Sequence, residues 1–456
     1  MEPDDRIVEP ERPHAVVDAT PGELGEPDPA LAEPNALRRV AHSFDALRVK
    51  PFRRVWGANF VSQSGDWLQI TARAVLIYDI TGSTGALGLI YFLSYLPQLV
   101  LSTPAGVLAD RLDRRKLLIW GQVVMGLCAL LMGVLAATGT ANLWNVGAVS
   151  LAFGVLGTIV LPTMQAVVPS LVPSERLNSA VSLNAATVAA TRVVGPLIAG
   201  LLIPIVGIKW LFFGNALSFI PVVAIWVVTR LPERIAIERT GMVHEVLEGI
   251  RFVRRTATLK VALLVTFVIV GLGSIYQPLA VAFCTSVLAG GDNDLGASYY
   301  GMFQAALGIG SFIGIMGVTD LASRRTARAI TVSAVCFGVS LGLLGLTGVP
   351  ALAIGIAGFV GLYQFCTNAL CLTVLQHHAP KDMQGRILSL YTLAFVGTMP
   401  ILGLVGGQIA EAIGTDRTIL AVAVGALVFT IPLARRWSRF LPQGDSAIAP
   451  DQAPPS

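Results

Sequence analysis

Two long apolar runs are joined by the polar stretch Gly106-Val107-Leu108-Ala109-Asp110-Arg111-Leu112-Asp113-Arg114-Arg115-Lys116. The first run is expected to be a hydrophobic helix that ends at Ala109, and the chain becomes apolar again at Leu117. Lysine and arginine at this density between two apolar runs are typical of a short cytoplasmic turn between membrane-spanning helices. The stretch therefore predicts a membrane protein whose chain turns back at this point.

The composition agrees with a membrane protein. Apolar residues make up 54% of the chain and charged residues 13%, whereas a soluble domain carries about 25% charged residues. The formal net charge is +4, but the lysines and arginines lie in turns between apolar runs rather than in one patch, so no nucleic-acid partner is expected. The five cysteines lie inside apolar runs and form no Cys-x-x-Cys pair, which predicts neither a disulfide nor a metal site.

The lengths of the apolar runs and their punctuation by glycine, proline and charge predict about twelve membrane-spanning helices. We expect these spans at 55–79, 86–109, 115–138, 143–166, 180–206, 210–230, 260–286, 298–319, 328–348, 351–375, 387–412 and 416–436. The turns on one side hold most of the basic residues: 111–116, Arg176, 230–260, Arg324, Arg325, Arg328, Lys381, Arg386, Arg435, Arg436 and Arg439. The opposite turns hold Asp79, Lys209, Asp292, Asp294, Asp416 and Arg417. This asymmetry, with an even number of spans, predicts that both termini are cytoplasmic.

The spans divide into two halves. Residues 1–35 are expected to form a disordered cytoplasmic tail, because they are rich in proline and acids and cannot bury enough apolar surface to order themselves. We expect a first six-helix bundle at 50–230 and a second at 260–437. The connection at 231–259 is a cytoplasmic linker with a predicted amphipathic helix, and 438–456 is a cytoplasmic tail.

The stretch 106–116 resembles the signature loop of the major facilitator superfamily, and its surroundings look most like the drug and siderophore exporters of the proton-antiporter type. The resemblance is carried by Gly106, Asp110, Arg111, Arg114 and Arg115. Asp113 takes the place of the second glycine of the usual pattern. The same spacing recurs in the second half as Asp320, Arg324 and Arg325, as expected of parallel repeats. The resemblance implies an all-α membrane protein of twelve transmembrane helices, in two pseudo-symmetric six-helix bundles around a central cavity.

The resemblance also implies a role for the signature loop. Asp110 would stabilise the state that is closed to the cytoplasm, by lying near the start of the eleventh span around 384–387. Arg114 and Arg115 would hold the loop between the two bundles. The loop would then act as a conformational gate.

A second resemblance concerns Gly195-Pro196-Leu197-Ile198-Ala199-Gly200 in the fifth span. It is similar to the helix-bending Gly-Pro motif of antiporter-type members, with Ala199 in place of a glycine. Close helix packing is the simpler interpretation of Gly195 and Gly200. The fourth span lacks the buried arginine that many antiporters carry.

The first span carries a polar stripe. At 100° per residue, one third of the helix circumference holds Asn59, Ser62, Gln63, Asp66, Gln69 and Arg73. Asp66 and Arg73 are separated by about 10 Å along the helix axis. Ionisable residues within a span are costly and usually face an aqueous cavity or a partner. The stripe predicts part of a substrate and proton cavity; the alternative is a buried Asp–Arg pair that only fixes packing.

Other polar residues inside the spans complete the predicted cavity. Arg192 is expected to face the cavity or to act as counter-charge to an acid such as Asp66. The second half adds Tyr276, Gln277, Gln304, Gln364 and Asn368. Each of these could instead form an interhelical hydrogen bond.

We therefore expect a secondary transporter of the cell membrane, and not an enzyme, that exports small amphipathic organic compounds by proton antiport. The sequence holds no G-x-x-x-x-G-K-[ST] nucleotide motif, so an ATP-driven pump is not expected and no cofactor is predicted. Asp66 is the expected proton carrier, since burial favours its neutral form and a nearby guanidinium its charged form. The expected partners are the substrate, protons and the bilayer, with the protein a monomer. The alternatives are a metabolite importer, a lipid flippase, or a receptor or scaffold without transport.

Overall fold

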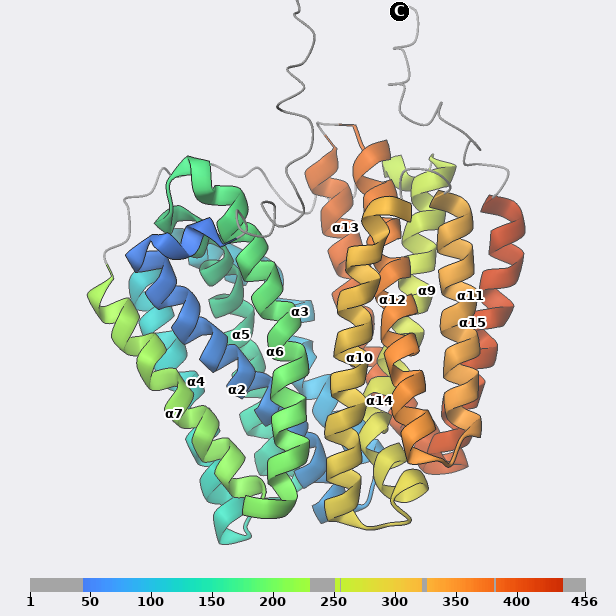
Figure 1. Ribbon diagram of the computed structural model, residues 1–456, viewed down its shortest axis with the longest axis horizontal. Coiled ribbons are helices and arrows are strands. Elements are labelled where there is room, and N and C mark those ends of the chain that lie inside the picture. The colour runs from blue at the N-terminus through green and yellow to red at the C-terminus, as the bar shows by residue number, and fades with distance from the viewer. Residues whose placement is uncertain (1–43, 230–250, 255, 322–325, 381–382, 438–456) are drawn as a thin grey trace, which may run out of the picture.

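The computed structural model describes residues 44–229, 251–254, 256–321, 326–380 and 383–437. These ranges are almost entirely helical, and the helices form two bundles that lie side by side (Figure 1). The predicted tails, Arg324, Arg325 and nearly all of the predicted linker helix lie outside the described residues. The side chains of Asp110, Arg111 and Asp320 are also outside the description, although the backbone there is helical.

The first bundle contains six helices: α2 (Lys50–Thr81), α3 (Thr84–Arg111), α4 (Arg114–Thr138), α5 (Leu143–Val167), α6 (Leu177–Val206) and α7 (Ile208–Val228). The second bundle contains α9 (Ala257–Ala282), α10 (Asn293–Leu321), α11 (Thr326–Leu346), α12 (Pro350–His378), α13 (Gln384–Val396), α14 (Thr398–Ile413) and α15 (Thr415–Trp437). Six residues of π-helix, Phe283–Leu288, continue α9. The all-α fold in two bundles is therefore confirmed.

Eleven spans of the described chain are long and apolar enough to cross a membrane. α2 is not among them, although its 32 residues exceed the length required, because its polar stripe lowers its hydropathy. The predicted eleventh span is interrupted at Gly397, between α13 and α14. Pro400 lies in the first turn of α14, where a backbone N–H has no partner within the helix, so the proline is accommodated after the break.

Asp113 explains how the turn after α3 forms without the second glycine of the usual pattern. Its backbone is extended, with φ −61° and ψ 108°, and its side chain accepts hydrogen bonds from the backbone N–H groups of Arg115 and Lys116. Asp113 is thus the N-cap of α4, a position that aspartate favours. No left-handed residue is needed there, so aspartate replaces glycine without strain.

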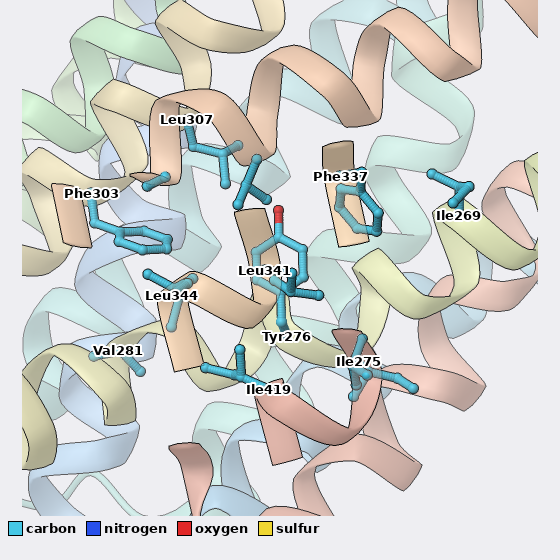
Figure 2. Packing of buried hydrophobic residues seen from close by; sticks show 14 of the residues in the cluster. Ile269, Ile275, Tyr276, Val281, Phe303, Leu307, Phe337, Leu341, Leu344 and Ile419 are labelled. Carbon is cyan, nitrogen blue, oxygen red and sulfur yellow. The ribbon is translucent and has the colours of Figure 1, made fainter. Parts of the chain in front are cut away.

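The core of the second bundle surrounds Tyr276 of α9. Figure 2 shows its ring among Phe303 and Leu307 of α10, Phe337, Leu341 and Leu344 of α11, and Ile419 of α15. The Tyr276 side chain is only 1% exposed. Its ring therefore belongs to the packing of one bundle, whereas it was predicted to line the cavity between the two.

Glycines bring the two bundles into contact along two seams, α3 with α14 and α6 with α10. A methyl group at Gly88 would lie 2.9 Å from the carbonyl oxygen of Gly403 and 3.0 Å from Cα of Gly407. A methyl group at Gly200 would lie 2.7 Å from Cα of Gly301. Since α-carbons can approach this closely only where side chains are absent, the glycines allow the helices to touch.

Both glycine seams lie toward one side of the protein. We call the side at which α2, α4 and α6 begin the basic side, and the other the opposite side. Gly88 lies in the second turn of α3, and Gly407 lies near the end of α14, both toward the opposite side. In Figure 1, α6 and α10 approach each other at the lower edge and diverge toward the upper edge, where α6 begins. The bundles therefore meet on the opposite side and separate toward the basic side.

Candidate functional site

A pocket lies between the two bundles. It is lined by Arg192 of α6, Val270, Ser274 and Gln277 of α9, Gln364, Phe365 and Asn368 of α12, Phe395 of α13 and Met399 of α14. Four of the predicted cavity residues meet here: Arg192, Gln277, Gln364 and Asn368. They come from three helices that are far apart in the sequence, and Arg192 is the contribution of the first bundle.

Arg192 is held between two aromatic rings. Its guanidinium carbon lies 5.0 Å from the centroid of the Trp67 ring on α2 and 4.7 Å from that of Phe365 on α12. Within the ranges that the structure describes, Arg192 forms no ion pair. Cation–π contacts contribute about 0.5–2 kcal/mol, whereas a charge at the centre of a bilayer costs at least about 2.5–3.5 kcal/mol. The two contacts together contribute about 1–4 kcal/mol, so the rings offset much of the cost of burying this charge, but they supply no counter-charge.

Two tyrosines fix the carboxamides of the pocket. The Tyr91 hydroxyl donates to Oε1 of Gln277 at 3.3 Å, which joins α3 to α9 across the bundle interface. The Tyr276 hydroxyl donates to Oε1 of Gln364 at 3.1 Å. With both carbonyl oxygens engaged in this way, the amide nitrogens remain as the donors of these two side chains. The lining also holds one acceptor that is unpaired within the described residues, the buried Oδ1 of Asn368, so the pocket offers donors on two side chains and an acceptor on a third.

Two residues of the polar stripe of α2, Asp66 and Gln69, face α7 inside the first bundle. Nδ2 of Asn215 donates to Oε1 of Gln69 at 2.9 Å and makes a longer contact of 3.5 Å with Oδ1 of Asp66. Arg73 is 8% exposed. Neither Arg73 nor Arg192 pairs with Asp66 in the described chain. The alternative interpretation, a buried Asp–Arg pair, is therefore wrong for this conformation, because an amide on a neighbouring helix takes the place of the guanidinium.

Several predicted cavity residues do not reach the pocket. Asn59 is 4% exposed, while Gln63 of α2 and Gln304 of α10 are half-buried, and none of the three lines the pocket. Tyr276 does not line the pocket, but its hydroxyl donates a hydrogen bond to the pocket residue Gln364. The direction in which each helix faces decides these cases, and it cannot be read from residue type alone.

The signature loop has an unexpected partner. Nε of Arg115 donates to the carbonyl oxygen of Trp226 at 3.0 Å, and its Nη2 donates to that of Val227. These carbonyls belong to the last turn of α7, where unpaired carbonyl groups attract cations. Arg115 therefore fastens α4 to α7 within the first bundle, and the prediction that it lies between the bundles is wrong for this conformation. Arg114 is half-buried.

The predicted helix-bend motif packs α6 on two sides. A methyl group at Gly195 would lie 2.5 Å from Cβ of Trp67 and 2.7 Å from the carbonyl oxygen of Ser64, both on α2. Gly200 faces Gly301 of the other bundle instead. Pro196 lies inside a helix that continues to Val206. In this conformation the motif serves close packing, with one glycine for each bundle.

Glu411, near the end of α14, makes a contact with the start of α3 that the sequence did not predict. Its Oε2 accepts hydrogen bonds from the Ser83 hydroxyl at 3.0 Å, the Thr84 hydroxyl at 2.9 Å and the Gly85 N–H at 3.0 Å. A carboxylate at the first turn of α3 is favoured by the unpaired N–H groups and by the helix dipole. Ser83 and Thr84 signal a helix start, but no local pattern could identify a partner in the other bundle.

No group of three histidine, cysteine, aspartate or glutamate side chains in the described ranges is arranged to hold a metal ion. The chemistry available is therefore that of the pocket: one cation, several amide donors and an aromatic and apolar wall. The enclosed space is small in this conformation, about 10 Å³, so the pocket must widen before it can hold an organic molecule by apolar contact with a few polar anchors.

Comparisons with known proteins give a consistent result. Residues 41–455 match the model of the family described as transmembrane secretion effector. The chain is 27% identical over 413 residues to the enterobactin exporter EntS of Shigella boydii serotype 18, which covers 87% of this chain and 96% of that relative. The enterobactin exporter EntS of Escherichia coli O139:H28 gives the same identity and coverage.

Solved structures share the fold at low identity. A bacterial homologue of the human lysosomal transporter Spinster, in an inward-facing and unoccupied conformation, superposes with a TM-score of 0.67 at 14% identity, covering 86% of this chain and 98% of that one. The nucleoside transporter NupG gives a TM-score of 0.65 at 13% identity, with 86% and 99% covered. The relatives and the fold are those of a membrane transporter, not of an enzyme.

Proposed function

Since the chain belongs to the transmembrane secretion effector family of the major facilitator superfamily, we propose that it exports small amphipathic organic compounds of the drug, antibiotic or siderophore class by proton antiport. The relatives that are named as enterobactin exporters support export and the siderophore class. The transport cycle would alternate the access of the pocket between the two sides of the membrane.

The observation that carries this proposal is the position of the pocket. It is lined from both bundles, and the bundles touch through glycines on the opposite side while they diverge toward the basic side. Rocking of the two bundles around such a pocket would close the basic side and open the opposite one. A receptor or scaffold has no need of a polar pocket at the interface of two bundles.

Asp66 is the proposed proton carrier. In the described chain its partner is the neutral amide of Asn215, at 3.5 Å, rather than a guanidinium. Protonation of Asp66 would therefore break no ion pair with a buried guanidinium, and so it would avoid the large cost of breaking such a pair. Helix movement that changes the access of water to Asp66 would change its proton affinity, as antiport requires.

The orientation follows from the charge asymmetry of the turns. We propose that the basic side is cytoplasmic, so that both termini are cytoplasmic and the structure is open toward the cytoplasm. Asp110 would then make its gating contact near 384–387 only after the bundles approach each other on that side. We propose that the protein acts in the inner or plasma membrane as a monomer.

Export can be tested by overexpression in a strain that lacks its own exporters, with intracellular accumulation of a panel of drugs, macrolide antibiotics and siderophores as the readout. Lower accumulation of at least one compound, reversed by a protonophore, supports proton-driven export. Higher accumulation would favour an importer, and transbilayer movement of labelled lipid a flippase. No change for any compound, together with no flux in proteoliposomes, would favour a receptor or scaffold.

A further inference from the structure

The charges inside the membrane-spanning part are unbalanced around the pocket. Arg192 lines the pocket, and Arg73 of α2 is also buried. Neither forms an ion pair within the described ranges. Asp66 is turned toward Asn215 of α7, and no acidic side chain lines the pocket. A cation that is desolvated without a counter-charge is costly, and a ligand can supply the missing charge.

Two of the remaining polar side chains of the pocket also offer donors to an acceptor ligand, whereas Asn368 offers its Oδ1, unpaired in the described part of the chain, as an acceptor. The carbonyl oxygens of Gln277 and Gln364 are engaged by Tyr91 and Tyr276, which leaves their amide nitrogens as donors. The Ser274 hydroxyl already donates to the carbonyl oxygen of Val270 at 2.8 Å. A cationic ligand would find no carboxylate here, and it would be repelled by Arg192.

The rest of the wall is apolar and partly aromatic. Phe365, Phe395, Val270 and Met399 line the pocket together with the polar groups. Phe365 lies under the guanidinium of Arg192, so the cation and the apolar wall are adjacent. A ligand whose negative group is attached directly to a planar ring would meet both at once.

We infer that Arg192 anchors an organic anion that carries a planar ring. Its carboxylate or phenolate binds the guanidinium and the amide donors, and its ring lies against the wall of the pocket. This inference rests on the proposed export function and narrows its substrates to anionic aromatic compounds. It excludes lipophilic cations as preferred substrates of this pocket.

The test uses the full chain in lipid nanodiscs and two probes of nearly equal shape, 2-naphthoate and its neutral analogue 2-naphthamide. Isothermal titration calorimetry should give tighter binding of the naphthoate to the wild type. Arg192→Gln should weaken naphthoate binding by about tenfold or more, as expected for the loss of a hydrogen bond to a charged group, and should change naphthamide binding by less than about twofold. Arg417→Gln, the same change at an exposed arginine, should leave both unchanged.

Arg192→Lys provides a second variant that keeps the charge. It should retain part of the preference for the anion, because lysine supplies the charge but not the planar fork of donors. Equal binding of the two probes to the wild type, no binding of naphthoate, or an unchanged preference in Arg192→Gln would overturn the inference.

The same proteins in proteoliposomes separate this inference from the proposed function. Transport of naphthamide as fast as naphthoate would leave export intact and overturn the anion site. Tight, Arg192-dependent binding of naphthoate without movement of any compound would support the anion site and contradict export.

Discussion

The polar stripe of α2 and the pocket around Arg192 both place ionisable groups within the membrane, but their partners differ. Asp66 and Gln69 meet Asn215 inside one bundle, whereas the pocket residues come from both bundles. The stripe would be disturbed when helices of the first bundle shift, and the pocket when the bundles rock. The comparison suggests that proton and substrate occupy separate sites, which are coupled through the movement of the helices.

The largest effect is expected from Asp66→Asn. The variant has no group at this site that can bind and release a proton, so export against a gradient should be lost while substrate binding remains. Asp66→Glu should retain part of the activity. The measurement is the uphill transport of substrate in proteoliposomes under an imposed pH gradient. Asp416→Asn, at an exposed position, is the control. Normal uphill export by Asp66→Asn would show that the proton site lies elsewhere.

Gly407→Val should disturb the glycine seam on the opposite side. A methyl group at Gly407 would already lie 2.6 Å from the carbonyl oxygen of Thr84 and 2.8 Å from Cα of Gly88, so a larger side chain must push α3 and α14 apart. We expect a population shifted toward opening on the opposite side, read as faster labelling of a cysteine placed at Ser83. Gly355→Val is the matched control, since its α-carbon faces open space. Unchanged labelling would mean that the seam does not control closure.

Glu411→Gln should have a smaller effect on the same seam. The variant replaces the carboxylate, which accepts hydrogen bonds from Ser83, Thr84 and Gly85, by a neutral amide. The amide keeps an oxygen acceptor, and the position is exposed. We expect opening on the opposite side to become favoured by about fivefold, within the range of coupling between sites. Labelling of a cysteine placed at the exposed Ile80 reports it, because a cysteine at Ser83 would itself remove one of these hydrogen bonds, and Glu175→Gln is the control. A labelling rate equal to that of the wild type would show that the contact is incidental.

The smallest effect on transport is expected from Arg115→Gln. Its hydrogen bonds to Trp226 and Val227 lie within the first bundle, so the loss should be one of stability, about 1–2 kcal/mol. A lower thermal unfolding temperature with unchanged substrate affinity would agree with this. Arg114→Gln is the comparison variant. If Arg115→Gln instead changed the accessibility of the pocket from the cytoplasm without a change in stability, Arg115 would act between the bundles.

Much of the fold was predictable, because the length of an apolar run and the charge of a turn are fixed by the bilayer. The functional site was less predictable from the sequence. Arg192 and Gln277 attract attention as polar residues within spans, but Trp67 and Phe365, which hold Arg192, are ordinary for a membrane helix. Whether a polar residue faces the pocket or a neighbouring helix depends on helix rotation, and this is why Asp66 faces α7 where a cavity was predicted.

We propose a division of roles in which Asp66 carries the proton and Arg192 binds the substrate. It is tested most directly by adding 2-naphthoate to proteoliposomes that contain a pH-sensitive dye and recording proton movement. The wild type should move protons in response to the compound, Asp66→Asn should bind the compound without proton movement, and Arg192→Gln should do neither at the same concentration. Proton movement of wild-type size in Asp66→Asn would contradict the account.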